Sequence, residues 1–491
     1  MATAAQAKVG ASQAKKEWQF TDWKAARETV YKLQKRIAKA IKSGSINKAK
    51  ALQRILTQSF SARVLAVRRV TQNQGKNTPG IDHIIWKTPK QKIQAVKDLK
   101  NRCYKASPLR RVYIPKKNGK LRPLGIPTIQ DRAMQALYLQ ALDPVAEMLA
   151  DRNSYGFRPK RSLHDAIEQC FKILCHKTSA RWILEGDIKA CFDEIGHEWL
   201  EHHAIMDKSV LKEWLKAGYM EKNVFHQTTR GCPQGGIASP TLANMALDGL
   251  EKAILRVARK GELIHFVRYA DDWVVTSSSK EVLEVKILPL VVEFLKERGL
   301  ELSHEKTKIT HIDEGFNFLG HNIRKYGGKL LIKPGKKGIK TFLSNIREVI
   351  RCKRTVKAED LIRILNPKIQ GWVNHYRHAV SKRVFSYIER SIFKSLWGWA
   401  KRRHPNKSLF WIKKKYFIRL GQRDWNFFSR QTGKSKEQEI LVLRNASDTH
   451  IRRHVKIKAD ATPYDAVYKD YFLNRSKCKI RMDSRTAQMQ S

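Results

Sequence analysis

Apolar side chains recur with different periods in successive parts of the chain. Between residues 22 and 70 they follow helical spacing, and a Ser-Gly-Ser step at residues 43–45 interrupts them. Residues 108–127 instead alternate around Asn118 and Gly119, a dipeptide that favours a tight turn between two strands. The pattern predicts a basic helical hairpin followed by a β-hairpin with basic arms.

The middle of the chain mixes the two periods. Residues 181–188 and 264–276 are rich in β-branched and aromatic side chains, which favours strands. Helical spacing occurs at residues 129–150, 238–258 and 282–298. Beyond Lys340 the pattern predicts long basic helices, whose many aromatic side chains we expect mostly in the core. Strands and helices in this mixture predict an α+β fold.

Two adjacent carboxylates, Asp271 and Asp272, interrupt the apolar pattern of residues 263–275. A second strand-like run ends upstream at Asp187. Neighbouring anions beside a buried sheet repel one another unless a cation neutralises them. If the strands are neighbours, the three carboxylates face one small volume. Such oxygen ligands suit Mg²⁺. Two Mg²⁺ ions at this place would serve in-line attack at a phosphorus atom. The alternative for an isolated Asp-Asp pair is a solvated turn.

The charge of the chain indicates the kind of partner it binds. Its 97 Lys and Arg against 45 Asp and Glu give a net charge of +52 over 491 residues. This surplus predicts a polyanionic partner, most simply a long nucleic acid. The alternative is a membrane-surface protein, but no apolar run approaches the length of a membrane span, so we expect no membrane partner.

Cysteine spacing and the N-terminus indicate the compartment. The seven cysteines include no Cys-x-x-Cys pair, so neither a zinc site nor a disulfide framework is indicated, and a reducing cytosol fits. The first residues lack the apolar core of a secretory signal. Their Ala, Lys and Gln suit a disordered basic arm better than an organellar transit peptide. We therefore expect a cytoplasmic, bacterial protein associated with the nucleoid.

Several motifs resemble those of a known family and follow the same order. YADD at residues 269–272 is similar to the signature of reverse transcriptases. The motifs that accompany it are IPKKNGKLRPLGIP (114–127), DRNSYGFRPKRS (151–162), DIKACFDEIGH (187–197), GCPQGGIASPTLANMALDGLE (231–251) and LSHEKTKITHIDEGFNFLG (302–320). Together they resemble group II intron-encoded reverse transcriptases, also called maturases, over about residues 20–420.

The resemblance implies a fold and a division into domains. The fold is an α+β right-hand polymerase with fingers and palm, followed by an α-helical thumb or maturase domain and a small basic C-terminal DNA-binding segment. The expected units are a disordered basic arm at residues 1–20, reverse transcriptase fingers and palm at 21–335, the helical thumb or maturase (X) domain at 336–420 and the basic C-terminal region at 421–491.

The resemblance also implies which residues form the site. Asp187, Asp271 and Asp272 match the catalytic carboxylates that bind two Mg²⁺ ions. The matches to nucleotide-binding positions are Lys116, Arg122, Phe192 and Gln234, with Lys306 where a proton donor to the leaving pyrophosphate can stand. The residues expected to contact template or intron RNA are Thr78, Pro79, Gly80, Arg377, Lys382, Arg383, Lys401, Arg402 and Arg403.

The implied function is RNA-directed DNA polymerisation combined with maturase activity. Such a protein binds its group II intron RNA, assists splicing and copies the inserted intron into cDNA during retrohoming, with target DNA and dNTPs as further partners. The alternatives are a reverse transcriptase domesticated for defence or a CRISPR system, and a polymerase-inactive splicing cofactor, against which the intact carboxylates argue. Residues 454–472 resemble the stretch that leads into an HNH endonuclease in many relatives, but with Cys478 as the one cysteine after them we expect no such endonuclease.

Overall fold

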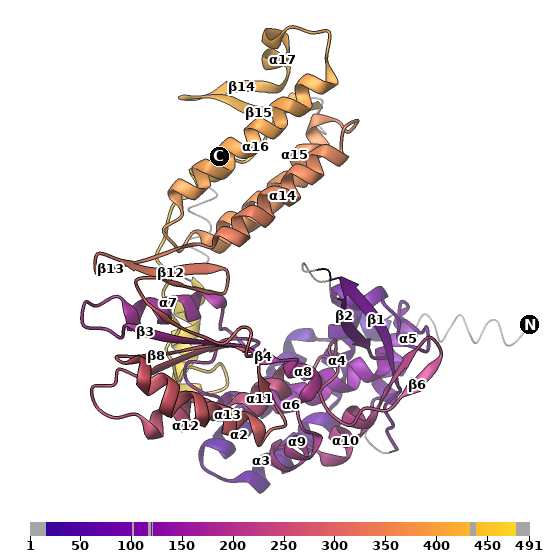
Figure 1. The fold of residues 1–491 in the computed structure, drawn as a ribbon. Helices are drawn as coiled ribbons and strands as arrows, with labels where there is room; N and C mark the ends of the chain where they lie inside the picture. Colours follow the sequence, from indigo (N-terminus) through magenta and orange to yellow (C-terminus); the bar gives the residue numbers. More distant parts are fainter. Residues whose placement is uncertain (1–15, 101–102, 116–118, 120, 433–437, 478–491) are drawn as a thin grey trace, which may run out of the picture.

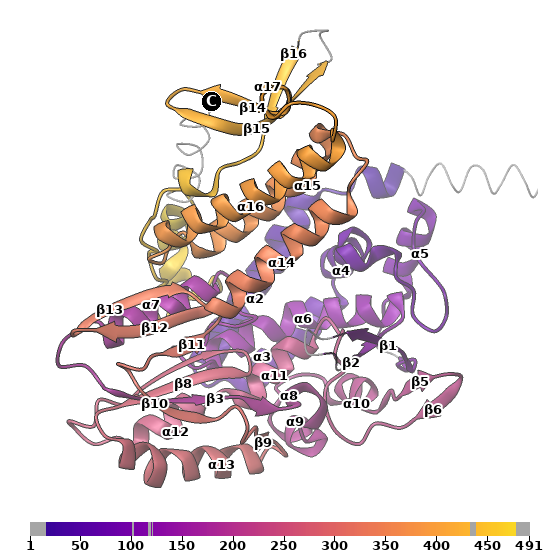
Figure 2. The ribbon, with the colours of Figure 1, turned by 45° about the horizontal axis from the view of Figure 1, so that its top comes forward.

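The computed structural model describes residues 16–100, 103–115, 119, 121–432 and 438–477. The chain forms a broad base of helices and sheets, and a column of long helices rises from it (Figure 1). The foot of the column adjoins the antiparallel strands β12 (His321–Tyr326) and β13 (Lys329–Pro334) (Figure 2). β12 lies at the centre of this three-stranded sheet and also pairs with β11 (Phe316–Phe318). Across the described residues, no helix is both long and apolar enough to span a membrane.

The centre of the N-terminal helical group is α6 (Ile129–Leu149), which is buried along most of its length. The helices packed around it are α2 (Trp23–Lys42), α3 (Ile46–Gln58) and α4 (Phe60–Gln72), with α5 (Pro89–Asp98) against α4. The predicted hairpin over residues 22–70 is therefore three helices, because the Ser59 hydroxyl accepts a hydrogen bond from the Ala62 amide and caps a new helix. Residues 16–19, part of the arm predicted to be disordered, are helical.

Two four-stranded sheets carry the rest of the base. The first, in the order β2-β1-β5-β6, is built from β1 (Leu109–Pro115), β2 (Leu121–Ile126), β5 (Tyr219–Glu221) and β6 (Val224–His226). The second, in the order β10-β3-β8-β7, is built from β3 (Trp182–Gly186), β7 (His265–Tyr269), β8 (Asp272–Ser277) and β10 (Lys308–His311). The predicted strands and the predicted β1–β2 hairpin are confirmed, although turn residues 116–118 lie outside the described residues.

Shorter elements complete the base. The helices are α7 (Leu163–Leu174), α8 (Cys191–Glu194), α9 (His197–His203), α10 (Lys208–Lys216), α11 (Ser239–Leu247), α12 (Leu250–Val257) and α13 (Leu288–Lys296), and β4 (Ile188–Lys189) pairs with β9 (Glu301–Leu302). The helix predicted over residues 238–258 is broken in two because Gly249 adopts a φ of +98°.

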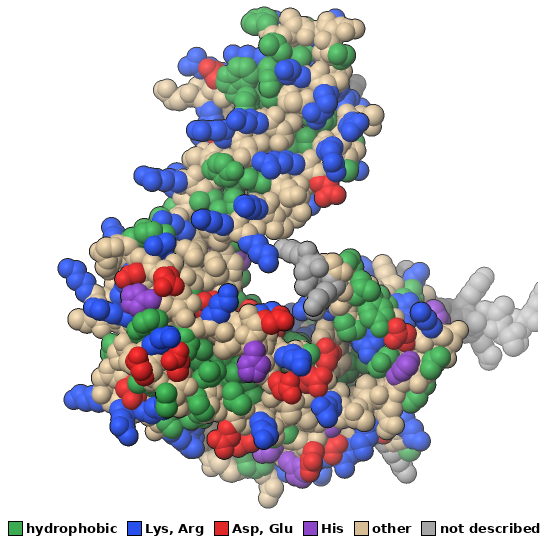
Figure 3. Space-filling view, viewed as in Figure 1, with side chains coloured by type: hydrophobic (Ala, Val, Ile, Leu, Met, Phe, Trp, Pro, Cys, Tyr) green, Lys and Arg blue, Asp and Glu red, His purple; other side chains and the backbone are tan. Residues whose placement is uncertain are grey.

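A hollow separates the foot of the column from the β1–β2 lobe, with Lys and Arg on its rim and acidic side chains beneath it (Figure 3).

The column has an apolar core of its own. Its helices are α14 (Lys336–Cys352), α15 (Ala358–Tyr376), α16 (Lys382–Arg403) and α17 (Leu409–Tyr416), which confirms the long helices predicted beyond residue 340. The far end is closed by β14 (Phe417–Leu420), β15 (Arg423–Thr432) and β16 (Gln438–Val442). Because β14 and β15 form one hairpin, the predicted boundary at residue 420 falls inside a structural unit.

After β16 the chain returns to the base and contacts it at several places. Near α2, the Lys42 ammonium lies 2.8 Å from the Asp465 carboxylate. Near α7, His454 and Arg475 contact Asp165 at 2.9 and 3.0 Å. The returning segment therefore links the far end of the column to the base.

Histidines gather where the column, the base and the returning segment meet. The members of this histidine cluster are His164, His321, His375, His378 and His454, with neighbouring ring centroids 4.6 to 5.9 Å apart. Burial lowers the pKa of His321 and of His378 to about 4 in each case. The Nδ1 of His378 donates to the Arg452 carbonyl over 2.7 Å, so a neutral ring already satisfies this contact.

We expect the free energy of unfolding to fall as the pH drops from about 6.5 to about 4. In this range His321 and His378 bind protons in the unfolded chain but stay neutral in the folded chain. Above about pH 6.5 the two histidines are neutral in both states and do not lower the free energy of unfolding. Thermal melting across the window measures the loss. The double variant His321→Asn, His378→Asn keeps a donor at the Nδ1 positions and should lose less Tm over the same window; an equal loss would contradict this assignment.

Candidate active site

The β7–β8 hairpin presents two of the predicted carboxylates. Tyr269 pairs with Asp272, so Ala270 and Asp271 form a two-residue turn in which Ala270 has a φ of +57°. A left-handed residue at this position matches the twist of the two flanking strands. Since both strands are largely buried, the turn holds Asp271 and Asp272 on a rigid support.

Asp187 reaches the same end of the sheet from β3. Gly186, the last residue of β3, pairs with Trp273 of β8, so Asp187 follows beside Asp272. A Cβ at Gly186 would lie 2.0 Å from the Trp273 indole, so this close strand approach requires glycine. The structure therefore brings the three predicted carboxylates together at one sheet edge.

The electrostatics of these carboxylates call for a cation. Burial, reinforced by the charges of Asp271 and Asp187, raises the pKa of Asp272 to about 6. Burial likewise raises the pKa of Asp271, although the positive charges of Arg122 and Lys306 oppose the shift. The Lys306 ammonium forms an ion pair with Asp187. The anionic cluster thus already attracts two cationic side chains, Arg122 of β2 and Lys306 of the turn before β10.

The donor set suits a hard divalent cation. Carboxylate oxygens are the ligands that Mg²⁺ prefers in proteins. Within the part of the chain that the structure describes, no group of three His, Cys, Asp or Glu side chains is arranged to hold a metal ion. Lys306 contacts Asp187 instead, and its 65% exposed side chain is free to turn away. The chemistry of the three carboxylates therefore fits Mg²⁺.

A buried arginine behind the turn fixes its position. Arg268 is fully buried, and its guanidinium forms an ion pair with Asp248. The same group donates to the side chain of Asn244 over 3.1 Å and to the carbonyl of Ala270 over 3.4 Å. One side chain thus connects α11 and the residue after it to the turn that carries Asp271.

Residues 151–158 pack against β7 and the turn of the β7–β8 hairpin. The Tyr155 amide donates to the Arg268 carbonyl over 2.9 Å, and a Cβ at Gly156 would lie 2.3 Å from the Ala270 nitrogen. Arg158 is buried against Glu147 with a nitrogen to oxygen distance of 2.7 Å. The segment DRNSYGFR is therefore the backing of the carboxylate turn, a role that its sequence alone did not reveal.

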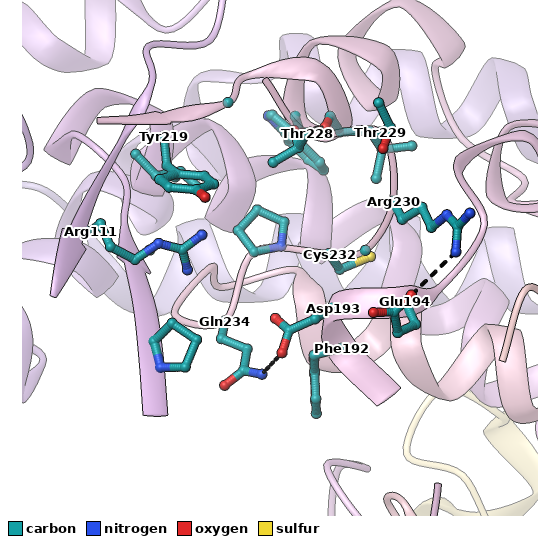
Figure 4. Close-up of a pocket in the computed structure, with 18 of the residues that line it drawn as sticks. Arg111, Phe192, Asp193, Glu194, Tyr219, Thr228, Thr229, Arg230, Cys232 and Gln234 are labelled. Carbon is teal, nitrogen blue, oxygen red and sulfur yellow. Dashed lines mark hydrogen bonds and ion pairs between the residues drawn. The ribbon is translucent and has the colours of Figure 1, made fainter. Parts of the chain in front are cut away.

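A pocket of about 650 Å³ lies next to α8 and contains two of the predicted nucleotide-binding residues (Figure 4). Phe192 and Asp193 stand on one side, and Arg111 lies on the other with its guanidinium 3.7 Å from the Tyr219 ring centroid. Gln234 lies between them and donates to the Asp193 carboxylate over 2.8 Å. Arg111 was not predicted, because nothing in its sequence context separates it from other basic strand residues.

The other two predicted nucleotide-binding residues fall elsewhere. Arg122 of β2 is close enough to influence the pKa of Asp271, so it belongs to the carboxylate side of the site. Lys116 lies outside the described residues. Phe157, which was also not predicted, stands edge-on to Phe192 with the ring centroids 6.2 Å apart and has a φ of +58°.

Three family models match the chain. The model of reverse transcriptase (RNA-dependent DNA polymerase) matches residues 114–323, and that of the N-terminal domain of reverse transcriptase matches residues 18–99. The maturase-specific domain of group II introns matches residues 339–417. These matches support a polymerase fold of mixed helices and sheets, with the maturase match lying on the column.

Two bacterial proteins are similar over most of their own length. Protein YkfC of Escherichia coli is 35% identical over 304 residues, which cover 52% of this chain and 79% of that protein. Group II intron-encoded protein LtrA of Lactococcus lactis is 30% identical over 421 residues, which cover 66% of this chain and 70% of that protein. The chain belongs to the family of group II intron reverse transcriptases and maturases.

As a member of this family, the protein is an RNA-directed DNA polymerase with a maturase function in intron splicing. A solved structure of telomerase from Candida albicans, in complex with a fragment of telomeric RNA, aligns with 65% of each chain at 10% identity and a TM-score of 0.34.

The residues predicted to contact RNA lie in two regions. The loop of Thr78, Pro79 and Gly80 is held against the start of α6, where Arg132 donates to the Thr78 carbonyl over 2.7 Å. The others flank or belong to α16, with Arg377, Lys382 and Arg383 near its start and Lys401, Arg402 and Arg403 in its last turn. Arg403 also donates to the carbonyls of residues 354 and 356, so it supports the loop between α14 and α15.

Gly156→Ala should lower the rate of primer extension by about a hundredfold, because the added methyl group displaces the turn at Ala270 and small displacements of reacting groups cost rates of this order. Overpacking here should also lower the free energy of unfolding by about 1–3 kcal/mol. The matched control is Gly371→Ala in α15, where a Cβ meets nothing within 4 Å. A folded Gly156→Ala protein that extends primers at the rate of the control would show that the turn tolerates the shift.

Proposed function

We propose that Asp187, Asp271 and Asp272 hold two Mg²⁺ ions and form the catalytic centre that extends a DNA primer on an RNA template. The convergence of the three carboxylates at the ends of two neighbouring central strands carries this proposal. The raised pKa of Asp272 supports the proposal. The same repulsion that disfavours ionisation of Asp272 beside Asp187 and Asp271 favours the binding of a cation among the three carboxylates. When bound, the ions would supply positive charge at the attacking and leaving oxygens.

The neighbouring residues have the chemistry to bind and position a dNTP. Arg122 brings a planar guanidinium, which suits phosphate oxygens, to the carboxylate side. Phe192 offers a ring against which the sugar of a nucleotide can pack, and Gln234 offers an amide on the same pocket wall. Lys306 lies beside Asp187, whose hydrogen bond raises the pKa of the ammonium, and its 65% exposed side chain can turn toward a bound nucleotide. It can therefore offer a proton or a charge to the departing pyrophosphate.

The hollow between the column and the β1–β2 lobe is the proposed path of the template and primer. In this assignment, residues 21–335 are fingers and palm. The column from residue 336 through β16 is the thumb or maturase domain, and the returning segment after β16 contacts DNA. The Lys and Arg side chains on the rim of the hollow at the foot of the column suit a phosphate backbone (Figure 3).

The column is the proposed binding surface for the group II intron RNA. It carries the maturase match and exposes many Lys and Arg side chains along its length (Figure 3). A chain that both binds the intron and polymerises DNA is suited to copy the intron into cDNA at its insertion site. The proposed biological role is therefore splicing followed by retrohoming, with target DNA as a further partner.

Asp271→Asn should abolish primer extension on an RNA template while RNA binding stays within about twofold of the wild type. The metal ions are expected to supply several kcal/mol of transition-state stabilisation, so the rate should fall by about a thousandfold or more. RNA affinity is expected to depend on basic surfaces elsewhere and therefore to persist. Single-turnover extension and filter binding on the same preparation measure the two quantities.

Asp313→Asn is the matched control. Asp313 follows β10 at the end of the sheet opposite to Asp187, and its side chain is 62% exposed. This variant should extend primers at the rate of the wild type. Extension by Asp271→Asn at a comparable rate would reject the catalytic assignment, and wild-type protein that binds intron RNA without extending any primer would favour a splicing cofactor.

A further inference from the structure

An aromatic cleft lies at the far end of the column, away from the carboxylates. It is about 750 Å³ in volume and opens between α16, the β14–β15 hairpin and residues 443–447. Its aromatic walls are formed by Phe393, Trp397, Phe417 and Trp425. A cavity of this size is large enough for a compact organic group. Hydrophobic side chains are exposed among Lys and Arg in this region of the surface (Figure 3).

Trp425 is held over the cleft in a strained conformation. Its φ is +66°, a region that bulky residues rarely adopt, and it lies in the irregular stretch of the β14–β15 pairing, between the partners of Ile418 and Leu420. Its ring lies 5.4 Å from that of Trp397 and 5.7 Å from that of Phe393, yet its side chain stays 40% exposed. Strain of this kind persists where the surroundings fix it and is common at ligand sites. Packing alone does not require a tryptophan to remain so exposed.

The charges around the cleft suit a phosphate-bearing ligand. The Lys413 ammonium lies 4.5 Å from the Trp425 ring centroid, and Arg390 is exposed on the rim. The acidic groups at the cleft have cationic partners, since Arg423 contacts both Glu389 and Asp448 at 3.1 Å. Asp424 lies 3.9 Å from Arg419. The cleft therefore combines aromatic faces with cations at its mouth.

We propose that this aromatic cleft binds an unpaired nucleobase of the RNA, stacked on Trp425, with the adjoining phosphates beside Lys413 and Arg390. The inference rests on the RNA binding of the proposed function and names the feature of the RNA that the column recognises. Aromatic side chains stack on bases that have been splayed out of a helix, whereas paired bases are inaccessible to them. The cleft thus selects RNA at a bulge, loop or single-stranded segment.

The test compares two labelled oligomers with equal numbers of phosphates, a short oligoadenylate and its abasic counterpart, by fluorescence anisotropy at fixed salt. Trp425→Gly removes the ring and relieves the backbone strain, because glycine adopts positive φ freely, so the full chain should fold as well as the wild type. It should weaken binding of oligoadenylate by about tenfold and leave the abasic oligomer unchanged. Trp425→Phe retains an aromatic face and should keep most of the affinity.

The matched control is Phe410→Ala, which removes a more exposed aromatic side chain from α17 outside the cleft. It should leave both affinities unchanged. The proposal is overturned if Trp425→Gly binds oligoadenylate as tightly as the wild type, if it weakens both oligomers equally, or if Phe410→Ala causes the same selective loss. Primer extension by the same preparations is a separate readout, so a failure of the polymerase assignment is distinguishable from a failure here.

Discussion

The buried Arg268 fixes the geometry on which the proposed catalytic site depends. Its guanidinium is withdrawn from water and bound by Asp248, Asn244 and the Ala270 carbonyl. Such a pair contributes little net stability, because the cost of desolvating two charges offsets most of their attraction. Its contribution is positional. A shift of the turn that carries Asp271 would break the hydrogen bond from the buried guanidinium to the Ala270 carbonyl, so Arg268 helps to hold this turn in place before any cation arrives.

The same end of the sheet connects to the proposed RNA-binding surfaces through continuous packing. The segment that backs the turn leads into α7, which packs on β7 and whose Asp165 binds the returning segment. The histidine cluster then joins α7 to the ends of α15 and the returning segment. The base and the column are therefore joined through α7, the histidine cluster and the returning segment, and the hollow beside the column is the proposed path of the nucleic acid (Figure 3).

Local sequence predicted the elements well because periodicity and turn chemistry are local properties. The β1–β2 hairpin, the strands that carry Asp187 and Asp271, and the long helices of the column were all predictable on that basis. The pairings between distant charges were not, because a sequence does not indicate which carboxylate a buried arginine will meet. Aromatic residues of the column were expected mostly in the core, as Phe385 and Trp399 are, but the left-handed conformation that exposes Trp425 depends on a tertiary hairpin.

The central claim is that the three carboxylates form a divalent cation site, and calorimetric melting with and without Mg²⁺ tests it most directly. The two samples are compared at matched ionic strength. When the Mg²⁺ concentration is a hundred times the Kd of the site, binding stabilises the folded chain by about 2.7 kcal/mol, so Mg²⁺ should raise the Tm of the wild type. The double variant Asp187→Asn, Asp271→Asn should show no Mg²⁺-dependent rise. An equal rise in both proteins would contradict the claim.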